Sequence, residues 1–352
     1  HFSDTSKERI RSTGILFISI LICLTVINLS AQSVSLVGTS AASFLKIGVG
    51  GRALAMGEAY TTEVSDVTAL YWNPAGLAQI SNSQFLVSHY DFIADIYYDY
   101  AGAAISFGAL GTFGFHFAFL GMPDIDRTTV MEPEGTGEKA TAYSFSTGFS
   151  YGRTLTDRFD LGVTLKFIGE KIWHCTANGF AADIGVNYRT VFKNVRIGMS
   201  ISNFGTSMQM DGSDMLIQHD IDPLSDGNNS NITGKLETGE FSLPVLFRVG
   251  ISGNLTRDFF GLEKNDLILA CDVVHPNDNY EYMNVGGEYT YNNLFSLRGG
   301  YRRLFLEDAE GGLTFGFGLN LTIQNIGLRL DYAAVDFGRL DYLNKFSLIL
   351  SL

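Results

Sequence analysis

Apolar and polar residues alternate along most of the chain, in segments of roughly ten residues separated by turn-forming residues. Successive side chains of a β-strand point to opposite faces, so each segment predicts a strand with one apolar face and one polar face. From Ser83 onward we count fourteen segments: 83–90, 98–108, 111–121, 140–151, 158–169, 179–189, 195–203, 241–254, 265–275, 281–291, 294–303, 310–323, 326–335 and 343–352.

The positions of the charged residues help to show which face of each strand points toward lipid. Ten charged residues fall on the polar face of their strands: Lys166, Asp183, Arg196, Arg248, Asp272, Glu288, Arg298, Arg302, Arg329 and Asp331. Alternation alone also fits a soluble sandwich or barrel, which turns its apolar face inward. Here the apolar residues are so many and so large that they would overfill one core, whereas an outward apolar belt suits lipid.

We therefore predict an all-β fold, a fourteen-stranded antiparallel transmembrane β-barrel over residues 83–352. Phe113, Phe315 and Leu348 should face lipid. If the first strand runs outward, the connections after even-numbered strands are periplasmic and should be short. They are 109–110, 152–157, 190–194, 255–264, 292–293 and 324–325, and of these 255–264 is the longest. The long polar connections Met122–Lys139 and Phe204–Glu240 then lie at the cell surface.

The N-terminus predicts export. Lys7, Arg9 and Arg11 precede an apolar run over 15–27, and small residues stand before Gln32. This is the pattern of a secretory signal peptide, residues 1–31. No later stretch approaches the ~20 continuous apolar residues that a membrane helix needs. We expect a multi-pass barrel in the bacterial outer membrane, in contact with its lipid.

Residues 32–82 predict a plug placed ahead of the barrel. Within them Gly48–Gln79 is the only long segment that does not alternate like a strand, and its Gly and Ala residues allow backbone to pack against backbone. Arg52–Ala59 predicts one short helix. A second, capped by Ser65, should end before Pro74, and 73–76 should form a turn. A purely structural plug and one with a ligand-binding or gating role both remain open.

Candidate chemistry is sparse. The histidines are scattered without a paired spacing, and Asp220, Asp222, Asp226 and Asn228 lack the Glu that closes a calcium loop, which favours a solvated acidic loop. No nucleophile motif is present. We predict no enzyme, catalytic residue, metal or cofactor. The net charge of −13 disfavours nucleic acid. Cys175 and Cys271 could pair, but we expect free thiols because Cys271 falls on an apolar face.

Two sets of candidate site residues follow. The first is a polar network inside the barrel that pairs with the plug, through Glu58 or Glu63: Glu288, Arg298, Arg302, Arg329 and Asp331. The second is a partner-binding loop, whose side chains offer adaptable apolar contact inside an acidic rim: Met208, Met210, Met215, Leu216 and Ile217. The alternative for the loop is that it only shields the barrel mouth.

The N-terminal segment resembles a known family. FLKIGVGGRALAMGEAY (residues 44–60) and SDVTALYWNPAGLAQ (65–79) resemble the N-terminal signature of the PorV/PorQ outer-membrane proteins, which are related to the FadL transporters. The terminal strand over 346–352 agrees. The resemblance implies a FadL-like barrel with an N-terminal hatch carried by a plug motif: Arg52, Met56, Gly57, Trp72, Asn73, Pro74, Ala75 and Gly76.

Two functions are then open. The resemblance implies an accessory or shuttle role in type IX secretion, in which outer loops bind the C-terminal domain of secreted cargo, translocon subunits or attachment-complex subunits. We favour this reading. The alternative is a FadL-like transporter that binds a hydrophobic small molecule beside the plug and releases it laterally or through the lumen.

Overall fold

The computed structural model describes residues 37–92, 95–220, 222, 231–259, 265–306 and 309–352. The chain divides into His1–Ser35 and Leu36–Leu352, and only the second unit is described below. The predicted signal peptide and the first residues of the predicted plug, 32–36, lie outside the described residues.

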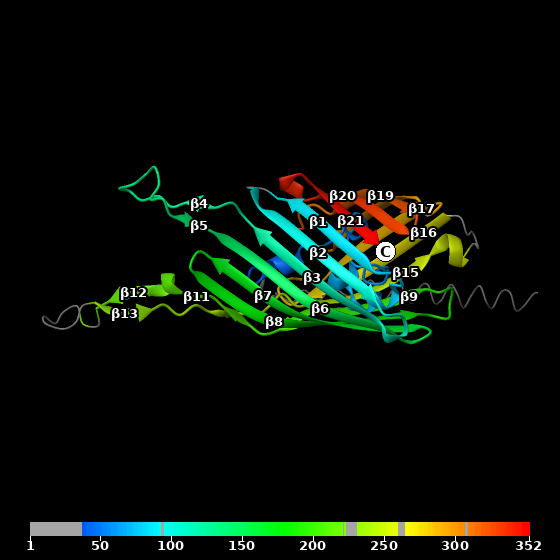
Figure 1. Cartoon of the computed structure of the whole chain (residues 1–352), viewed down its shortest axis with the longest axis horizontal. Coiled ribbons are helices and arrows are strands. Elements are labelled where there is room, and N and C mark those ends of the chain that lie inside the picture. Colours follow the sequence, from blue (N-terminus) through cyan, green and yellow to red (C-terminus); the bar gives the residue numbers. More distant parts are fainter. Residues whose placement is uncertain (1–36, 93–94, 221, 223–230, 260–264, 307–308) are drawn as a thin grey trace, which may run out of the picture. The chain divides into compact units, whose positions relative to one another are not determined.

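The described residues form a closed antiparallel barrel of fourteen strands, as predicted (Figure 1). Each wall strand pairs with its neighbours in the chain, and β1 pairs with β21 to close the ring, Val87 lying opposite Leu348. The wall strands are β1 (Gln84–Asp91), β2 (Tyr97–Ser106), β3 (Thr112–Gly121), β6 (Ala142–Thr156), β7 (Phe159–Ile172), β8 (Cys175–Arg189), β9 (Arg196–Gly205), β15 (Leu246–Asn254), β16 (Asn265–Pro276), β17 (Tyr282–Tyr291), β18 (Phe295–Leu304), β19 (Leu313–Ile323), β20 (Ile326–Asp336) and β21 (Tyr342–Ser351).

The remaining elements are short. The helices are η1 (Ser43–Lys46), α2 (Gly51–Ala55), α3 (Ala69–Trp72), η2 (Pro74–Gln79), η4 (Gly108–Leu110), η5 (Ser213–Met215), η6 (Leu255–Phe259) and η7 (Gly338–Leu340). The short strands are β4 (Ile125–Asp126), β5 (Lys139–Ala140), β10 (Met208–Gln209), β11 (Asp211–Gly212), β12 (Leu216–His219), β13 (Ile232–Lys235) and β14 (Glu240–Phe241). No helix among the described residues has the length and apolar character required to cross a membrane.

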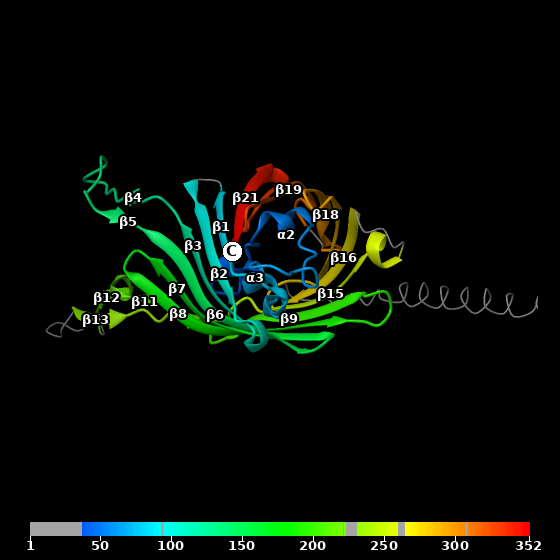
Figure 2. The ribbon, with the colours of Figure 1, turned by 45° about the vertical axis from the view of Figure 1, so that its right-hand side comes forward.

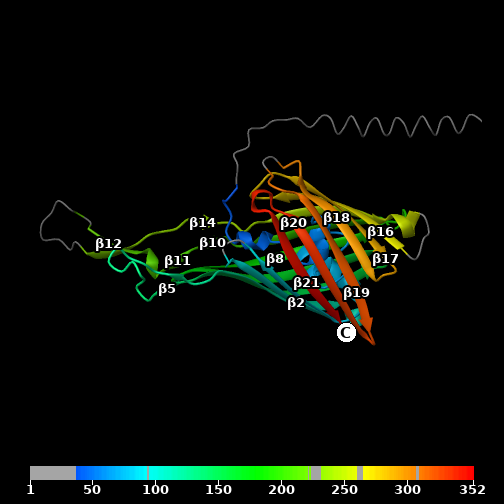
Figure 3. The same cartoon turned by 90° about the horizontal axis from the view of Figure 1, so that it is seen from above.

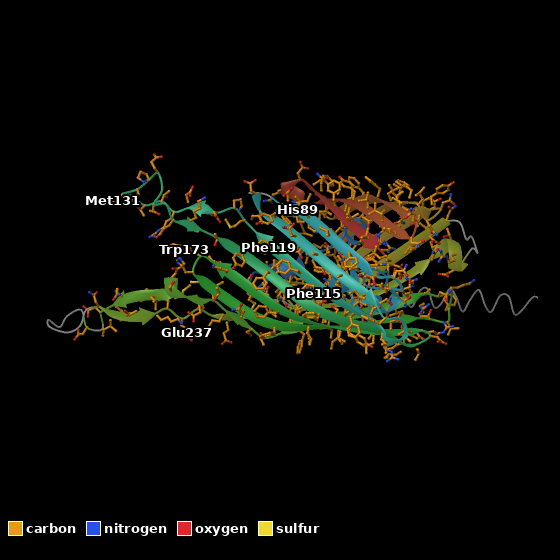
Figure 4. All side chains as sticks on the ribbon, viewed as in Figure 1. His89, Phe115, Phe119, Met131, Trp173 and Glu237 are labelled. Carbon is orange, nitrogen blue, oxygen red and sulfur yellow. The ribbon has the colours of Figure 1, made fainter. Side chains whose placement is uncertain are left out.

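The apolar faces of the strands point outward. Phe113, Phe315 and Leu348 are 50%, 48% and 39% exposed, and Figure 4 shows Phe115 and Phe119 along the outside of β3. The predicted inward charges are mostly buried, among them Asp272. Large exposed apolar residues around buried charges are the reverse of a soluble barrel and match a membrane barrel.

Several predicted strand ends were wrong. The predicted turn 152–157 is strand, because β6 runs to Thr156 with a bulge between Thr154 and Thr156. The predicted gap 170–178 belongs to a hairpin in which β7 and β8 meet at Trp173 and His174. These residues lack alternation, since a strand that extends beyond the lipid needs no apolar face. Conversely β15 begins only at Leu246, after Pro244, which cannot donate to a ladder.

The interior of the barrel is filled by residues 42–80, which we call the plug segment (Figure 2). Helix α2 packs against β19 and β20, whereas η2 packs against β6, β7 and β8. Trp72, Tyr60 and Met56 are among its completely buried side chains. The core of the molecule therefore lies between the plug segment and the inner face of the wall.

Local structure in the plug segment differs in part from the prediction. Helix α2 ends at Ala55, short of Ala59, and α3 covers only Ala69–Trp72. Asp66 rather than Ser65 satisfies the backbone ahead of α3, accepting from Thr68 N at 2.8 Å. Helix α3 does end before Pro74, as expected. Residues 74–79 form the 3-10 helix η2 instead of a turn, because Asn73 caps it by accepting from Ala75 N at 3.1 Å.

The long connections project from one end of the barrel, which we call the loop end (Figure 3). They carry the hairpins β4–β5 and β12–β13. In the connection between β9 and β15, strand β11 pairs with the first residues of β8, Cys175 and Thr176. This part of the connection therefore extends the barrel wall. The opposite end, the turn end, carries the connections after even-numbered wall strands and the end of β21.

Candidate functional site

Arg52 of helix α2 joins the plug segment to the wall. Its guanidinium donates to both carboxylate oxygens of Glu288 on β17, with Nε–Oε2 at 2.8 Å and Nη2–Oε1 at 2.6 Å. It also donates to Tyr60 Oη at 3.0 Å. A bidentate Arg–carboxylate pair fixes orientation as well as distance. This contact therefore sets how α2 sits against the wall.

Arg298 and Arg329 extend this pair into a network. Arg298 Nε donates to Glu288 at 2.5 Å, and its Nη1 donates to Asp331 at 2.7 Å. Arg329 donates to Asp331 at 3.1 Å and to Asp66 of the plug segment. The structure thus brings together four of the five residues predicted for the inner network and joins them to the plug segment through Arg52 and Asp66.

A glycine on β19 makes room for the contact between Arg298 and Asp331. Strand β19 lies between β18 and β20, so Arg298 must reach across it. A Cβ atom at Gly318 would lie 2.6 Å from both terminal guanidinium nitrogens of Arg298 and from Asp331 Oδ1. The network therefore depends on the missing side chain as well as on the charges.

Arg302, the fifth predicted network residue, lies apart from the other four and nearer the loop end. Its Nη1 donates to Glu58 Oε1 at 3.3 Å, and its guanidinium carbon lies 4.3 Å from the ring centre of Phe337. Lys345 on β21 lies 4.6 Å from the ring centre of Tyr90 and forms no ion pair with a described residue. Glu58 is thus the carboxylate of the plug segment that lies beside the two cations Arg302 and Lys345.

Glu63, the other predicted partner from the plug segment, contacts a different part of the wall. It accepts from Arg196 at 3.3 Å and from Ser252 at 2.5 Å. Both residues stand at the turn-end halves of their strands. Ion pairs thus hold the plug segment at several places along the barrel: Glu58 near the loop end, Arg52 and Asp66 in the middle, and Glu63 near the turn end. Lys46 adds a further ion pair, with Nζ 2.6 Å from Asp278 Oδ2.

Asn73 fastens the other side of the plug segment. Its Nδ2 donates to Thr61 O at 2.9 Å within the segment and to Val186 O of β8 at 3.2 Å. A Cβ atom at Gly185 would stand 1.9 Å from Asn73 Oδ1. Trp72 is held by its Nε1 donating to Val49 O at 2.8 Å. The predicted Asn-Pro-Ala-Gly motif is thus a cap and an anchor.

Met56 and Gly57 contact the wall through backbone. Gly57 has φ +63°, a conformation that disfavours side chains. Opposite it, a Cβ atom at Gly300 would lie 2.4 Å from Gly57 N and 2.4 Å from Met56 C. A Cβ atom at Gly286 would lie 2.1 Å from Met56 O. Glycines on β17 and β18 therefore let plug backbone touch wall backbone.

Two carboxylates of the plug segment, Asp66 and Glu58, are held ionised. Burial raises the pKa of Asp66, but Arg329 and Arg52 and the hydrogen bonds from Thr68 and Arg329 lower it by more, so it lies below the usual range. Burial also opposes ionisation of Glu58, and Arg302, Arg303 and Lys345 together bring its pKa below the usual value. Both carboxylates are thus charged across the neutral range, which preserves the ion pairs.

The predicted partner-binding residues differ in exposure. Leu216 and Ile217 are exposed on β12, whereas Met208 is buried beside Gly179. Met210 packs against the core cluster and Met215 is half-buried. Met208 is therefore unavailable for partner contact, because it seals the junction between this connection and β8. The acidic rim is partly engaged, since Asp211 pairs with Lys235 at 2.6 Å. Asp226 and Asn228 lie outside the described residues.

Sequence reasoning missed Asp66 as a network member and Asp272 as a backbone anchor. Asp272 accepts from the backbone N–H groups of Tyr60 and Thr61, each at 2.8 Å. Its inward position on β16 was evident from the alternation, but its partner was not. Cys175 and Cys271 are free thiols. Among the described residues no three His, Cys, Asp or Glu side chains gather as metal ligands would.

The comparisons with known proteins bear on the fold. No protein-family model matches the sequence, and no curated protein matches it. Among solved structures, the toluene transporter TbuX of Ralstonia pickettii is 13% identical with a TM-score of 0.52, covering 86% of this chain and 97% of that one. The toluene transporter TodX of Pseudomonas putida is 12% identical with a TM-score of 0.50, covering 86% and 97%.

The CymD monoaromatic hydrocarbon channel is also similar, at 12% identity and a TM-score of 0.52, covering 86% of this chain and 96% of that one. At these identities the similarity establishes the fold, which agrees with the strand count, the ring closure and the outward apolar face. The chain is therefore a fourteen-stranded, multi-pass β-barrel of the bacterial outer membrane that shares the fold of these transporters and channels.

Proposed function

We propose that this protein carries small hydrophobic molecules across the outer membrane. This was the alternative hypothesis from the sequence, and two features favour it over a role in secretion. The solved structures of the same fold are described as transporters or channels for toluene and other monoaromatic hydrocarbons. In addition, the interior of the barrel carries large aromatic side chains.

The aromatic interior is the observation that carries the proposal. Tyr90, Tyr98 and Tyr100 point inward from β1 and β2 and are at most 2% exposed. The rings of Tyr90 and Tyr98 stack with centres 5.8 Å apart, and Phe92 packs nearby against the core. The inner face of a general porin is polar and surrounds water. An inner aromatic surface instead provides favourable contact for an apolar ligand.

Unpartnered polar atoms border the same surface. Tyr100 Oη, His116 Nδ1 and Ser146 Oγ are buried and have no hydrogen-bond partner among the described residues. Tyr100 and His116 are stacked, with ring centres 5.7 Å apart. Buried polar atoms are almost always hydrogen-bonded, so water or a ligand is expected beside them. In this proposal the ligand passes next to the plug segment, which moves to let it through.

The test is uptake of radiolabelled toluene by intact cells that lack their own transporters of this fold. Cells making the protein should take up toluene several-fold faster than cells with an empty vector. Tyr98→Leu should reduce this uptake, because Tyr98 faces inward, whereas Tyr97→Leu on the outward face of the same strand should not. Uptake equal to that of the vector would refute the proposal.

Protein binding at the loop end is a second candidate, and one observation favours it. Apolar side chains are exposed in both projecting connections, with Met131 at 90% between β4 and β5 and Leu216 at 52% at the start of β12. Figure 4 shows Met131 at the end of its connection. Exposed apolar side chains of this kind often mark contacts with other proteins. They would suit the PorV/PorQ resemblance and a type IX secretion partner.

The loop can be tested separately from transport. Deleting residues 212–234 should leave the barrel assembled, since β9 and β15 pair with each other below it. Under the secretion hypothesis, cargo anchored at the cell surface should then fall sharply. Toluene uptake should persist, which distinguishes the two functions. Cargo attachment unchanged by the deletion would exclude this loop as the partner-binding site.

A further inference from the structure

A polar cavity lies at the turn end of the barrel, away from the aromatic surface. Its volume is about 270 Å³, and its walls come from the plug segment, from β8 and β9, and from β15 and β16. Three guanidinium groups line it, those of Arg189, Arg196 and Arg257. The lining is too polar for the hydrophobic ligand proposed above, so it indicates a separate site.

The pairing of strands places two of these arginines directly opposite each other. Arg189 of β8 is the register partner of Arg196 of β9, and both lie on the inward face. Side chains at such positions stand about 4.5–5.5 Å apart at Cβ, and like charges there are destabilising. Two guanidiniums therefore face each other inside a cavity in a chain whose net charge is −13.

The carboxylates around the cavity do not relieve this repulsion fully. Glu63 is shared between Arg196 at 3.3 Å and Ser252 at 2.5 Å. Asp266 is engaged by Arg257 at 2.7 Å and by Asn254 at 2.7 Å. Asp258 accepts from Asn194 at 3.1 Å. No described side chain bonds the guanidinium of Arg189, so its N–H donors are available.

We propose that this cavity binds a small water-soluble oxyanion, a phosphate or carboxylate group, between Arg189 and Arg196. The planar guanidinium fork matches the oxygens of either group, and an anion between two opposed guanidiniums removes their repulsion. Arg189, Arg196 and Asp266 stand on inward faces of wall strands, so the site is reached from water within the barrel mouth and not from the lipid. In the orientation predicted from the sequence, with the first strand running outward, that mouth faces the periplasm.

The same anion would compete with the plug segment. Arg196 is the only arginine of the opposed pair that contacts Glu63, and the contact of 3.3 Å leaves most of its donors unused. An anion that binds Arg196 weakens the ion pair that attaches Glu63 of the plug segment to the wall. Occupancy of the cavity is thereby linked to how firmly the plug segment is held at the turn end.

Isothermal titration of the full-length protein in detergent with inorganic phosphate, at ionic strength fixed by sodium chloride, tests the site. Saturable binding is expected, and Arg189→Gln should weaken it at least tenfold. Arg196→Gln should do the same. Arg127→Gln, which alters an exposed arginine paired with Glu138 at the loop end, should bind phosphate like the unaltered protein.

A second measurement uses only the unaltered protein, so its result does not depend on whether the variants fold. In the unaltered protein, phosphate should slow amide hydrogen exchange at the β8–β9 turn, residues 186–198, and leave the loop-end hairpins unchanged. Phosphate that binds no better than chloride and gives no such protection would overturn the proposal. So would tight binding that survives in both the Arg189 and Arg196 variants.

Discussion

Replacing Gly300 by alanine should loosen the plug segment while leaving the barrel closed. The new methyl group would stand 2.4 Å from the backbone of Met56 and Gly57, far inside any van der Waals contact. Gly300 has an ordinary backbone conformation, so the contact alone decides the effect. Overpacking typically costs 1–3 kcal/mol, and backbone cannot move aside as a flexible side chain can, so we expect about 3 kcal/mol.

Gly299→Ala is the matched control. Gly299 precedes Gly300 on β18 but faces outward, and a Cβ atom there has no neighbour nearer than Thr314 O at 4.0 Å. Amide hydrogen exchange in residues 48–60 should become roughly 100-fold faster in Gly300→Ala, which corresponds to about 3 kcal/mol. It should stay unchanged in Gly299→Ala. Equal exchange in both variants would show that the backbone contact does not hold the plug segment.

Glu288→Gln should destabilise the folded protein strongly. Glu288 is 3% exposed and neutralises Arg52 and Arg298 at once, at 2.6 Å and 2.5 Å. Glutamine keeps the shape but leaves two buried guanidiniums without their shared partner. Breaking a buried ion pair by removing one member costs about 3–5 kcal/mol. The free energy of unfolding, measured by urea titration in lipid vesicles, should fall by an amount in this range.

Glu138→Gln is the control for this second prediction. Its ion pair with Arg127 is exposed on both sides, and pairs of that kind contribute roughly 0–1 kcal/mol. The double variant Arg52→Met with Glu288→Gln should recover part of the loss, because it removes one of the stranded charges. A Glu288→Gln protein as stable as Glu138→Gln would mean that the inner network contributes little to stability.

The sequence predicted the barrel well because its physical cause is local. A two-residue period and a single apolar face are demanded of every strand that meets lipid, so the strand count and the outward position of Phe113, Phe315 and Leu348 could be derived. A strand that extends beyond the membrane no longer requires an apolar face. Residues 170–178 therefore gave no signal, although they continue the β7–β8 hairpin.

The inner network could be predicted only on the wall side. Arg298, Arg329 and Asp331 are fixed by strand parity and neighbouring strands, whereas their partner Asp66 depends on the path of the plug segment through the barrel. Arg302 shows the same limit, because it shares a face with Arg298 yet lies four residues nearer the loop end and meets Glu58 instead. Whether a residue is at an odd or even position along a strand determines the face on which its side chain lies. Its position along the barrel axis is known only from the folded structure.

The buried position of Met208 has a similar origin. In the sequence it belongs to a polar connection with several methionines, which favours an exposed surface. In the structure it fits against Gly179, where a Cβ atom would lie 2.8 Å from Met208 Cγ. Because Gly179 has no side chain, it leaves space on the wall, and the flexible apolar side chain of Met208 fills that space. A contact between residues so far apart in the chain has no local signature.

Residues 42–80 fill the interior of the barrel and should close it to ions. Single-channel recording in planar lipid bilayers tests this most directly. We predict that the unaltered protein passes almost no ionic current, and that Gly300→Ala and Glu288→Gln show frequent openings although both remain folded barrels. A steady, porin-like current through the unaltered protein, or variants that conduct no more than the unaltered protein, would show that residues 42–80 do not close the barrel.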